Sequence, residues 1–203
     1  MKKKWPITIA AIIITITIFI LILRIYNLGP FFQETGIIAG DWEFSTYAGG
    51  KLYNETVYGR LSLTFDVNST IDSQVYMLSQ QSKNPPVTST SLIRSSNTNC
   101  KIDWGWLGTG NNYAFLTWNG TNWIADTDNG SNTPEKTTIN GYYPATDWRK
   151  LTIQVNATQV TYYIDDRLVA THTTKIPSGE FQFYGELTST GTPAKLWITS
   201  HSY

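Results

Sequence analysis

The chain has 203 residues, with 15 Lys and Arg balanced by 15 Asp and Glu, and a single cysteine. A net charge of zero, with no basic cluster beyond the first 24 residues, argues against a nucleic-acid partner. One cysteine, Cys100, excludes an intramolecular disulfide.

Residues 1–24 predict a cytoplasmic basic start followed by a transmembrane helix. Three lysines at positions 2–4 precede an apolar run, residues 6–23, which has no charge before Arg24. At 1.5 Å per residue, a helix of this length nearly crosses the ~30 Å hydrocarbon core of a bilayer. The positive-inside rule then places residues 25–203 outside the cytoplasm. A cleaved secretory signal is the alternative, and it gives the same location.

The rest of the chain predicts a short juxtamembrane link, residues 25–36, and one ectodomain, residues 37–203. Four of the 15 cations flank the apolar run. The rest of the chain therefore has 11 cations and 15 acids, a net charge of −4. Apolar and polar residues alternate in short runs broken by Gly, Asn, Asp and Pro, and no helical period lasts three turns. This pattern predicts ten to twelve strands in two packed antiparallel sheets, with residues 82–99 as a long surface loop.

One stretch, residues 147–170, carries a family signal. Leu151 and Ile153 alternate with polar residues on one strand, Tyr162 and Ile164 do so on the next, and Asp165-Asp166 follows as a tight turn. Over residues 110–199 the sequence resembles the concanavalin A-like lectin/glucanase superfamily, including laminin-G-like domains. The resemblance implies an all-β, two-sheet jelly-roll sandwich but does not specify an activity.

Glycosidases of this superfamily carry two catalytic carboxylates on one strand, and this sequence lacks that motif. Glu180 and Glu186 would share a strand face, but six residues separate them by about 20 Å along a strand, too far for either hydrolytic geometry. His172 and His201 have no metal-ligand spacing and are expected to be exposed polar strand residues. The sequence therefore favours a non-catalytic domain.

Tryptophans are candidates for ligand stacking. Trp104 and Trp106 are two residues apart and share a strand face, where an exposed ring could stack on a sugar. Trp118 and Trp123 flank a four-residue turn and should meet across a hairpin. The alternative for both pairs is packing in the core or across the sheet.

Asp126 and Asp128 stand in a stretch, Asp-Thr-Asp-Asn-Gly, that resembles a calcium loop, in which alternate carboxylates and a glycine bend surround a hard cation. Many members of the superfamily bind calcium near their ligand site, so a Ca²⁺ cofactor is a possibility. The alternative is a solvated turn.

Sequons for N-glycosylation occur five times, mostly at predicted turns, where a glycan can fit. Their asparagines are Asn54, Asn68, Asn119, Asn129 and Asn156.

Together these features predict a membrane-anchored extracellular lectin-like domain that binds a glycan or a glycosylated surface partner without catalysis. One alternative is a structural envelope or surface-layer component, cellular or viral. A second is a divergent glycoside hydrolase, which would require two carboxylates brought together by the fold.

Overall fold

The computed structural model describes residues 42–141 and 143–203. The predicted anchor and link lie outside these residues, so the membrane partner and the extracellular location stay predictions. In the two described ranges, no helix has the length and hydrophobicity needed to cross a membrane.

The described residues form fourteen strands. These are β1 (Trp42–Tyr47), β2 (Lys51–Val57), β3 (Arg60–Val67), β4 (Gln74–Ser79), β5 (Val87–Ser95), β6 (Cys100–Leu107), β7 (Asn112–Trp118), β8 (Trp123–Asn129), β9 (Glu135–Thr138), β10 (Arg149–Val155), β11 (Val160–Ile164), β12 (Arg167–His172), β13 (Gln182–Ser189) and β14 (Ala194–Ser202).

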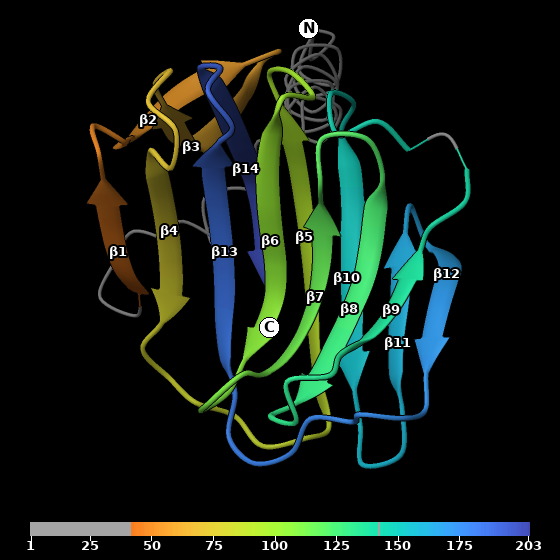
Figure 1. Ribbon diagram of the computed structural model, residues 1–203. Helices are drawn as coiled ribbons and strands as arrows, with labels where there is room; N and C mark the ends of the chain where they lie inside the picture. Colours follow the sequence, from red (N-terminus) through yellow and green to blue (C-terminus); the bar gives the residue numbers. More distant parts are fainter. Residues whose placement is uncertain (1–41, 142) are drawn as a thin grey trace, which may run out of the picture. The chain divides into compact units, whose positions relative to one another are not determined.

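The strands build two seven-stranded sheets that pack face to face (Figure 1). The order is β1-β4-β13-β6-β7-β8-β9 in sheet A and β12-β11-β10-β5-β14-β3-β2 in sheet B. Every paired strand is antiparallel. The predicted all-β sandwich is thus confirmed, with more strands than the ten to twelve expected.

The β10–β11 hairpin has the predicted core-facing residues. Ile153 lies opposite Tyr162 and Leu151 opposite Ile164, and all four side chains are buried. The turn that follows has positive φ at Asp165 and Asp166, 53° and 62°. A two-residue hairpin turn of this kind needs positive φ at both central positions, which Asp tolerates better than most residues.

The predicted surface loop at residues 82–99 is wrong, because β5 occupies the middle half of it and lies at the centre of sheet B. The inward positions of β5 are largely serine, which hid the strand from a search for apolar alternation. Ser89, Ser91 and Ser95 are 2%, 1% and 1% exposed. The Ser91 hydroxyl accepts a hydrogen bond from Trp104 Nε1 of sheet A at 2.8 Å, so small polar side chains here face large aromatic ones.

We expect Ile153→Ala to lower the free energy of unfolding by about 2–5 kcal/mol, because it opens a cavity in a packed core. Thr152 is only half-buried, on the other face of β10, and its hydroxyl bonds Thr90 at 3.0 Å. Thr152→Ala should therefore lower it by only about 1 kcal/mol. Urea denaturation of both variants measures the difference, and equal losses would contradict this assignment of inner and outer faces.

Candidate functional site

The outer face of sheet A gathers acidic, basic and aromatic side chains on its central strands. Along β13, β6, β7 and β8, residues that point away from the core alternate with buried ones. The register places Glu186 of β13 directly opposite Asp103 of β6. Carboxylates that are remote in sequence thus become neighbours across the sheet.

Glu186 is 8% exposed, and both of its carboxylate oxygens are hydrogen-bonded. The Tyr184 hydroxyl donates to one oxygen and the Thr188 hydroxyl to the other. Both donors stand two residues away on the same strand, on the same face. Burial, with the nearby Glu186 carboxylate, raises the pKa of Tyr184, so its phenol stays protonated and remains a donor.

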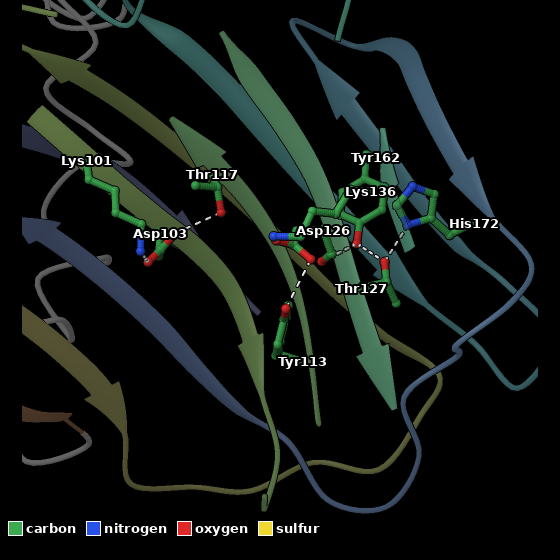
Figure 2. Close-up of polar contacts among 9 residues, drawn as sticks. All are labelled: Lys101, Asp103, Tyr113, Thr117, Asp126, Thr127, Lys136, Tyr162 and His172. Atoms are coloured by element: carbon green, nitrogen blue, oxygen red, sulfur yellow. Dashed lines mark hydrogen bonds and ion pairs between the residues drawn. The ribbon is translucent and has the colours of Figure 1, made fainter. Parts of the chain in front are cut away.

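Asp103 is held by its own pair of donors (Figure 2). Thr117 Oγ1 donates to one carboxylate oxygen at 2.8 Å, and Lys101 Nζ lies 2.6 Å from the other. Burial by itself would lower the pKa of Lys101. The carboxylates of Asp103, Glu186 and Asp126 outweigh it and raise that pKa, so the ammonium group remains charged beside the pair of acids.

Asp126 forms a second polar group, two strands from Asp103 (Figure 2). Lys136 Nζ of the edge strand β9 lies 2.8 Å from one carboxylate oxygen, and the Tyr113 hydroxyl donates to the other at 3.1 Å. Burial, and then the Asp126 carboxylate, raises the pKa of Tyr113. The Asp126 side chain is 10% exposed and that of Lys136 is 54% exposed, so the lysine is the accessible member of the pair.

A band of aromatic rings crosses the sheet beside the two polar groups, from β4 through β13 to β7. Ring centroids are 5.8 Å apart for Tyr76 and Tyr184, 5.7 Å for Tyr184 and Phe115, and 4.9 Å for Phe115 and Tyr113. Tyr184 and Phe115 meet over Gly105 of β6, which has no side chain to separate them. All four rings are half-buried, so each keeps part of its surface open to a ligand. We call the two polar groups and this band the outer-face cluster.

The predicted stacking role of Trp104 and Trp106 is not compatible with their positions. They share a strand face as expected, but it is the inner one, and their side chains are 1% and 0% exposed. Each packs edge-on against Phe183, with centroids 5.4 Å and 5.8 Å away. A Cβ atom at Gly185 would come within 2.4 Å of the Trp104 ring, so the glycine makes room for the indole.

Trp118 and Trp123 meet across the β7–β8 hairpin, with ring centroids 5.6 Å apart. They are 3% and 2% exposed, and their indole N–H groups donate to the carbonyls of Thr98 and Tyr143. Their edges line a hollow of about 360 Å³ at that end of the sandwich. They therefore pin the hairpin, and only their edges could touch a ligand.

The two aspartates of the predicted calcium loop lie on the outer face of β8 and already have partners. Asp126 pairs with Lys136, and Asp128 Oδ1 accepts hydrogen bonds from the Ser131 amide and hydroxyl at 2.9 and 3.0 Å. Among the described residues, no group of three His, Cys, Asp or Glu side chains is placed to hold a metal ion. Calcium binding stays a prediction that the geometry does not favour.

The sequon asparagines occupy turns and one edge strand. Asn119 and Asn156 bond the backbone amides of their own turns through Oδ1, and Asn68 donates to the Ala48 carbonyl. Asn54 is exposed on β2, and Asn129 ends β8. Glycosylation at these five sites stays a prediction.

Both histidines are buried, and the prediction that they are exposed is wrong. His172 is 0% exposed and His201 is 6% exposed. His172 lies between the sheets, bonded to Thr127 Oγ1 and Thr137 Oγ1, and His201 Nδ1 bonds Ser91 Oγ at 2.7 Å. Burial holds the pKa of His201 at about 3, so it is neutral. Side chains alternate between the two faces along β12 and β14, and this alternation could have predicted that the two histidines face the core.

Sequence reasoning missed Glu186 and Asp103 as a pair because it looked for two acids on one strand. Each is recognisable as outward-facing from its own alternation, for example Asp103 between the buried Ile102 and Trp104. Their meeting depends on β13 pairing with β6, which are separated by more than 70 residues. A strand order cannot be read from local alternation.

Comparison with known proteins extends the resemblance. A family model described as "3-keto-alpha-glucoside-1,2-lyase-like domain" matches residues 27–201. No curated protein matches this sequence.

Solved structures share the fold at low sequence identity. The Bacillus licheniformis beta-glucanase superposes with a TM-score of 0.61 and 13% identity, over 79% of this chain and 90% of that one. A Bacteroides ovatus family 16 glycoside hydrolase, in complex with a G4G4G3G product, gives 0.62 and 9%, over 80% and 94%. A Crh5 transglycosylase in complex with NAG gives 0.64 and 12%, over 80% and 83%.

The concanavalin A-like fold is thus confirmed and extends well upstream of residue 110. The prediction of a non-catalytic lectin-like domain is wrong, because the matching family is named for a lyase and the neighbours above are glycan-processing enzymes. These findings favour the enzymatic alternative.

Proposed function

Because the chain belongs to the family of 3-keto-alpha-glucoside-1,2-lyase-like domains, we propose that it is a glycan-processing enzyme whose catalytic surface is the outer-face cluster. The observation that carries this proposal is the Glu186–Asp103 pair, set beside the Lys101 cation and bordered by aromatic rings. The reaction that fits these groups is elimination across the C1–C2 bond of a glycoside that carries a ketone at C3.

The ketone makes such an elimination accessible to a carboxylate base. It acidifies the C–H bond at C2, and a base takes that proton while the electron pair moves into an enolate on the C3 oxygen. Return of the pair forms a C1=C2 double bond and breaks the bond from C1 to the departing oxygen, which takes a proton from water. One base and one stabiliser of the enolate are required.

The site offers a candidate for each role. Glu186 accepts hydrogen bonds at both oxygens, which fits an ionised carboxylate, and it is the proposed base. Lys101, kept charged by the acids around it, is the proposed partner of the enolate oxygen. Asp103 orients Lys101 through the 2.6 Å contact. The rings of Tyr184 and Phe115 would lie against the apolar C–H face of the sugar.

Hydrolysis of an unoxidised glycoside is the second candidate, and one geometric observation favours it. Residues directly opposite each other in an antiparallel pair have Cβ atoms about 4.5–5.5 Å apart. Glu186 and Asp103 are such a pair, so their two carboxylates start from neighbouring positions on one face of the sheet. Retaining glycosidases require two carboxyl groups about 5–5.5 Å apart, and side chains placed this way can adopt that separation.

The products separate the two candidates. With a 3-keto-glucoside, we expect the purified protein to form a conjugated enone, detected by its ultraviolet absorbance, together with the free alcohol. With the corresponding unoxidised glucoside, we expect no turnover. Reducing sugar released from the unoxidised substrate, without ultraviolet absorbance, would instead establish hydrolysis.

A further inference from the structure

A polar network lies behind the Asp126–Lys136 pair, on the inner side of sheet A (Figure 2), and it is buried except at Thr137 of the edge strand. Thr127 Oγ1 of β8 bonds the Tyr162 hydroxyl and lies 2.6 Å from His172 Nδ1. His172 Nε2 lies 3.0 Å from Thr137 Oγ1 of β9, and the Tyr162 hydroxyl also donates to the Asp126 carbonyl at 3.1 Å. Tyr162 and His172 belong to sheet B, so the network joins the two sheets.

The network contacts the residues next to the ion pair. Thr127 follows Asp126 on β8, and Thr137 follows Lys136 on β9. Because side chains alternate along a strand, Thr127 and Thr137 lie on the opposite face from Asp126 and Lys136, and both contact the same imidazole. The ring of His172 therefore joins β8 to β9 immediately behind the pair that stands on the outer face.

The hydrogen bonds indicate which nitrogen of His172 carries a proton. Tyr162 donates to the Asp126 carbonyl, so the Thr127 hydroxyl donates to the Tyr162 oxygen and accepts from the Nδ1–H group of His172. In the neutral ring Nε2 then accepts a hydrogen bond from the Thr137 hydroxyl. Loss of the imidazole would leave the buried Thr127 hydroxyl without one of its partners, whereas Thr137 on the exposed edge strand could bond water.

We infer that His172 is a positioning residue, which holds Asp126 and Lys136 in place to bind sugar hydroxyls of the substrate. This inference rests on the proposed function. Lys136 is the exposed cation of the outer-face cluster on β9, away from Lys101, and is suited to hydrogen-bond sugar hydroxyls. His172 acts only through the strands and touches no substrate, so its loss should weaken binding rather than the proton transfer at Glu186.

The test compares three variants on the 3-keto-glucoside. His172→Leu removes both hydrogen bonds, and we expect KM to rise about tenfold with kcat changed less than twofold. His172→Gln can still accept and donate through its carboxamide, and should restore KM to within about threefold of the wild type. His201→Leu is the matched control, a buried histidine bonded to Ser91 and outside this network. It should lower the melting temperature without raising KM.

The pH profile gives a further readout. Burial lowers the pKa of His172, although the Glu135 and Asp126 carboxylates oppose this, and Tyr162 facing it is a neutral phenol. The neutral form is thus favoured in the fold, and its contribution is lost as pH falls below the ordinary value of about 6.5. KM of the wild type should rise in that range, and the rise should be absent in His172→Gln.

Hydrogen exchange tests the inference independently of activity. We expect the amides of β8 and β9 to exchange faster in His172→Leu than in His201→Leu at equal global stability. If exchange and KM are the same in the two variants, His172 is only a core residue and the inference is overturned. Suppose that neither the wild type nor any variant turns over a 3-keto-glucoside, but amide exchange is still faster in His172→Leu than in His201→Leu. The proposed function then fails, while the positioning of Asp126 and Lys136 stands.

Discussion

Glu186→Gln should lower kcat on a 3-keto-glucoside by about 10²–10⁴-fold, the usual contribution of a positioned general base. The substitution is nearly isosteric. The carboxamide oxygen can still accept from Tyr184 or Thr188, and the other hydroxyl can rotate to accept from the new NH₂ group. The fold should therefore survive, and a thermal melt within a few degrees of the wild type would verify it. Only the ability to take the C2 proton is removed.

Glu180→Gln is the matched control, because it makes the same chemical change six residues away on an exposed residue that precedes β13. Its kcat should equal that of the wild type. Turnover by Glu186→Gln within threefold of the wild type, at full stability, would remove Glu186 from the mechanism.

Asp103→Asn separates the two candidate reactions further. If the carboxylates act as acid and nucleophile in hydrolysis, both are essential, and the two variants should be equally inactive. In the elimination, Asp103 only orients Lys101, so Asp103→Asn should lower kcat less than Glu186→Gln does.

The fold was largely predictable because it depends on local alternation. Ile153 and Tyr162 were assigned to the core of adjacent strands from their spacing, and they pair directly. β5 was missed because its inward residues are serines, whose role becomes visible only once the tryptophans of sheet A are placed opposite them. Small polar residues do not produce the apolar alternation that predicts a strand. They are nevertheless needed in this core, because they leave room for the large tryptophan rings opposite.

The candidate site was not predictable by the same means. Alternation indicates that Asp103 and Glu186 point outward from their strands, but their contact depends on a pairing between strands far apart in sequence. Alternation also leaves open which face of a strand is the inner one. Trp104 and Trp106 were correctly placed on one face, and the error was to consider that face exposed, which only the packing of the second sheet decides.

Trp104→Ala should lower the free energy of unfolding by about 3–5 kcal/mol, because the ring is 1% exposed and its removal leaves a large cavity between the sheets. Its indole N–H also donates to Ser91, which in turn bonds His201, so the variant removes one member of a buried chain of hydrogen bonds. Gly185 cannot close the gap because it has no side chain. Denaturant unfolding measures the loss.

Trp148→Ala is the matched control, because this ring is only half-buried. The Arg60 guanidinium carbon lies over it, 5.6 Å from the ring centroid. Its loss should be about 1 kcal/mol, in line with cation–π contacts near the surface. The KM of the folded Trp104→Ala protein should match the wild type, because the indole faces the core and not the outer-face cluster. A raised KM with little change in stability would mean that Trp104 contacts the ligand after all, and that the inner face of sheet A takes part in binding.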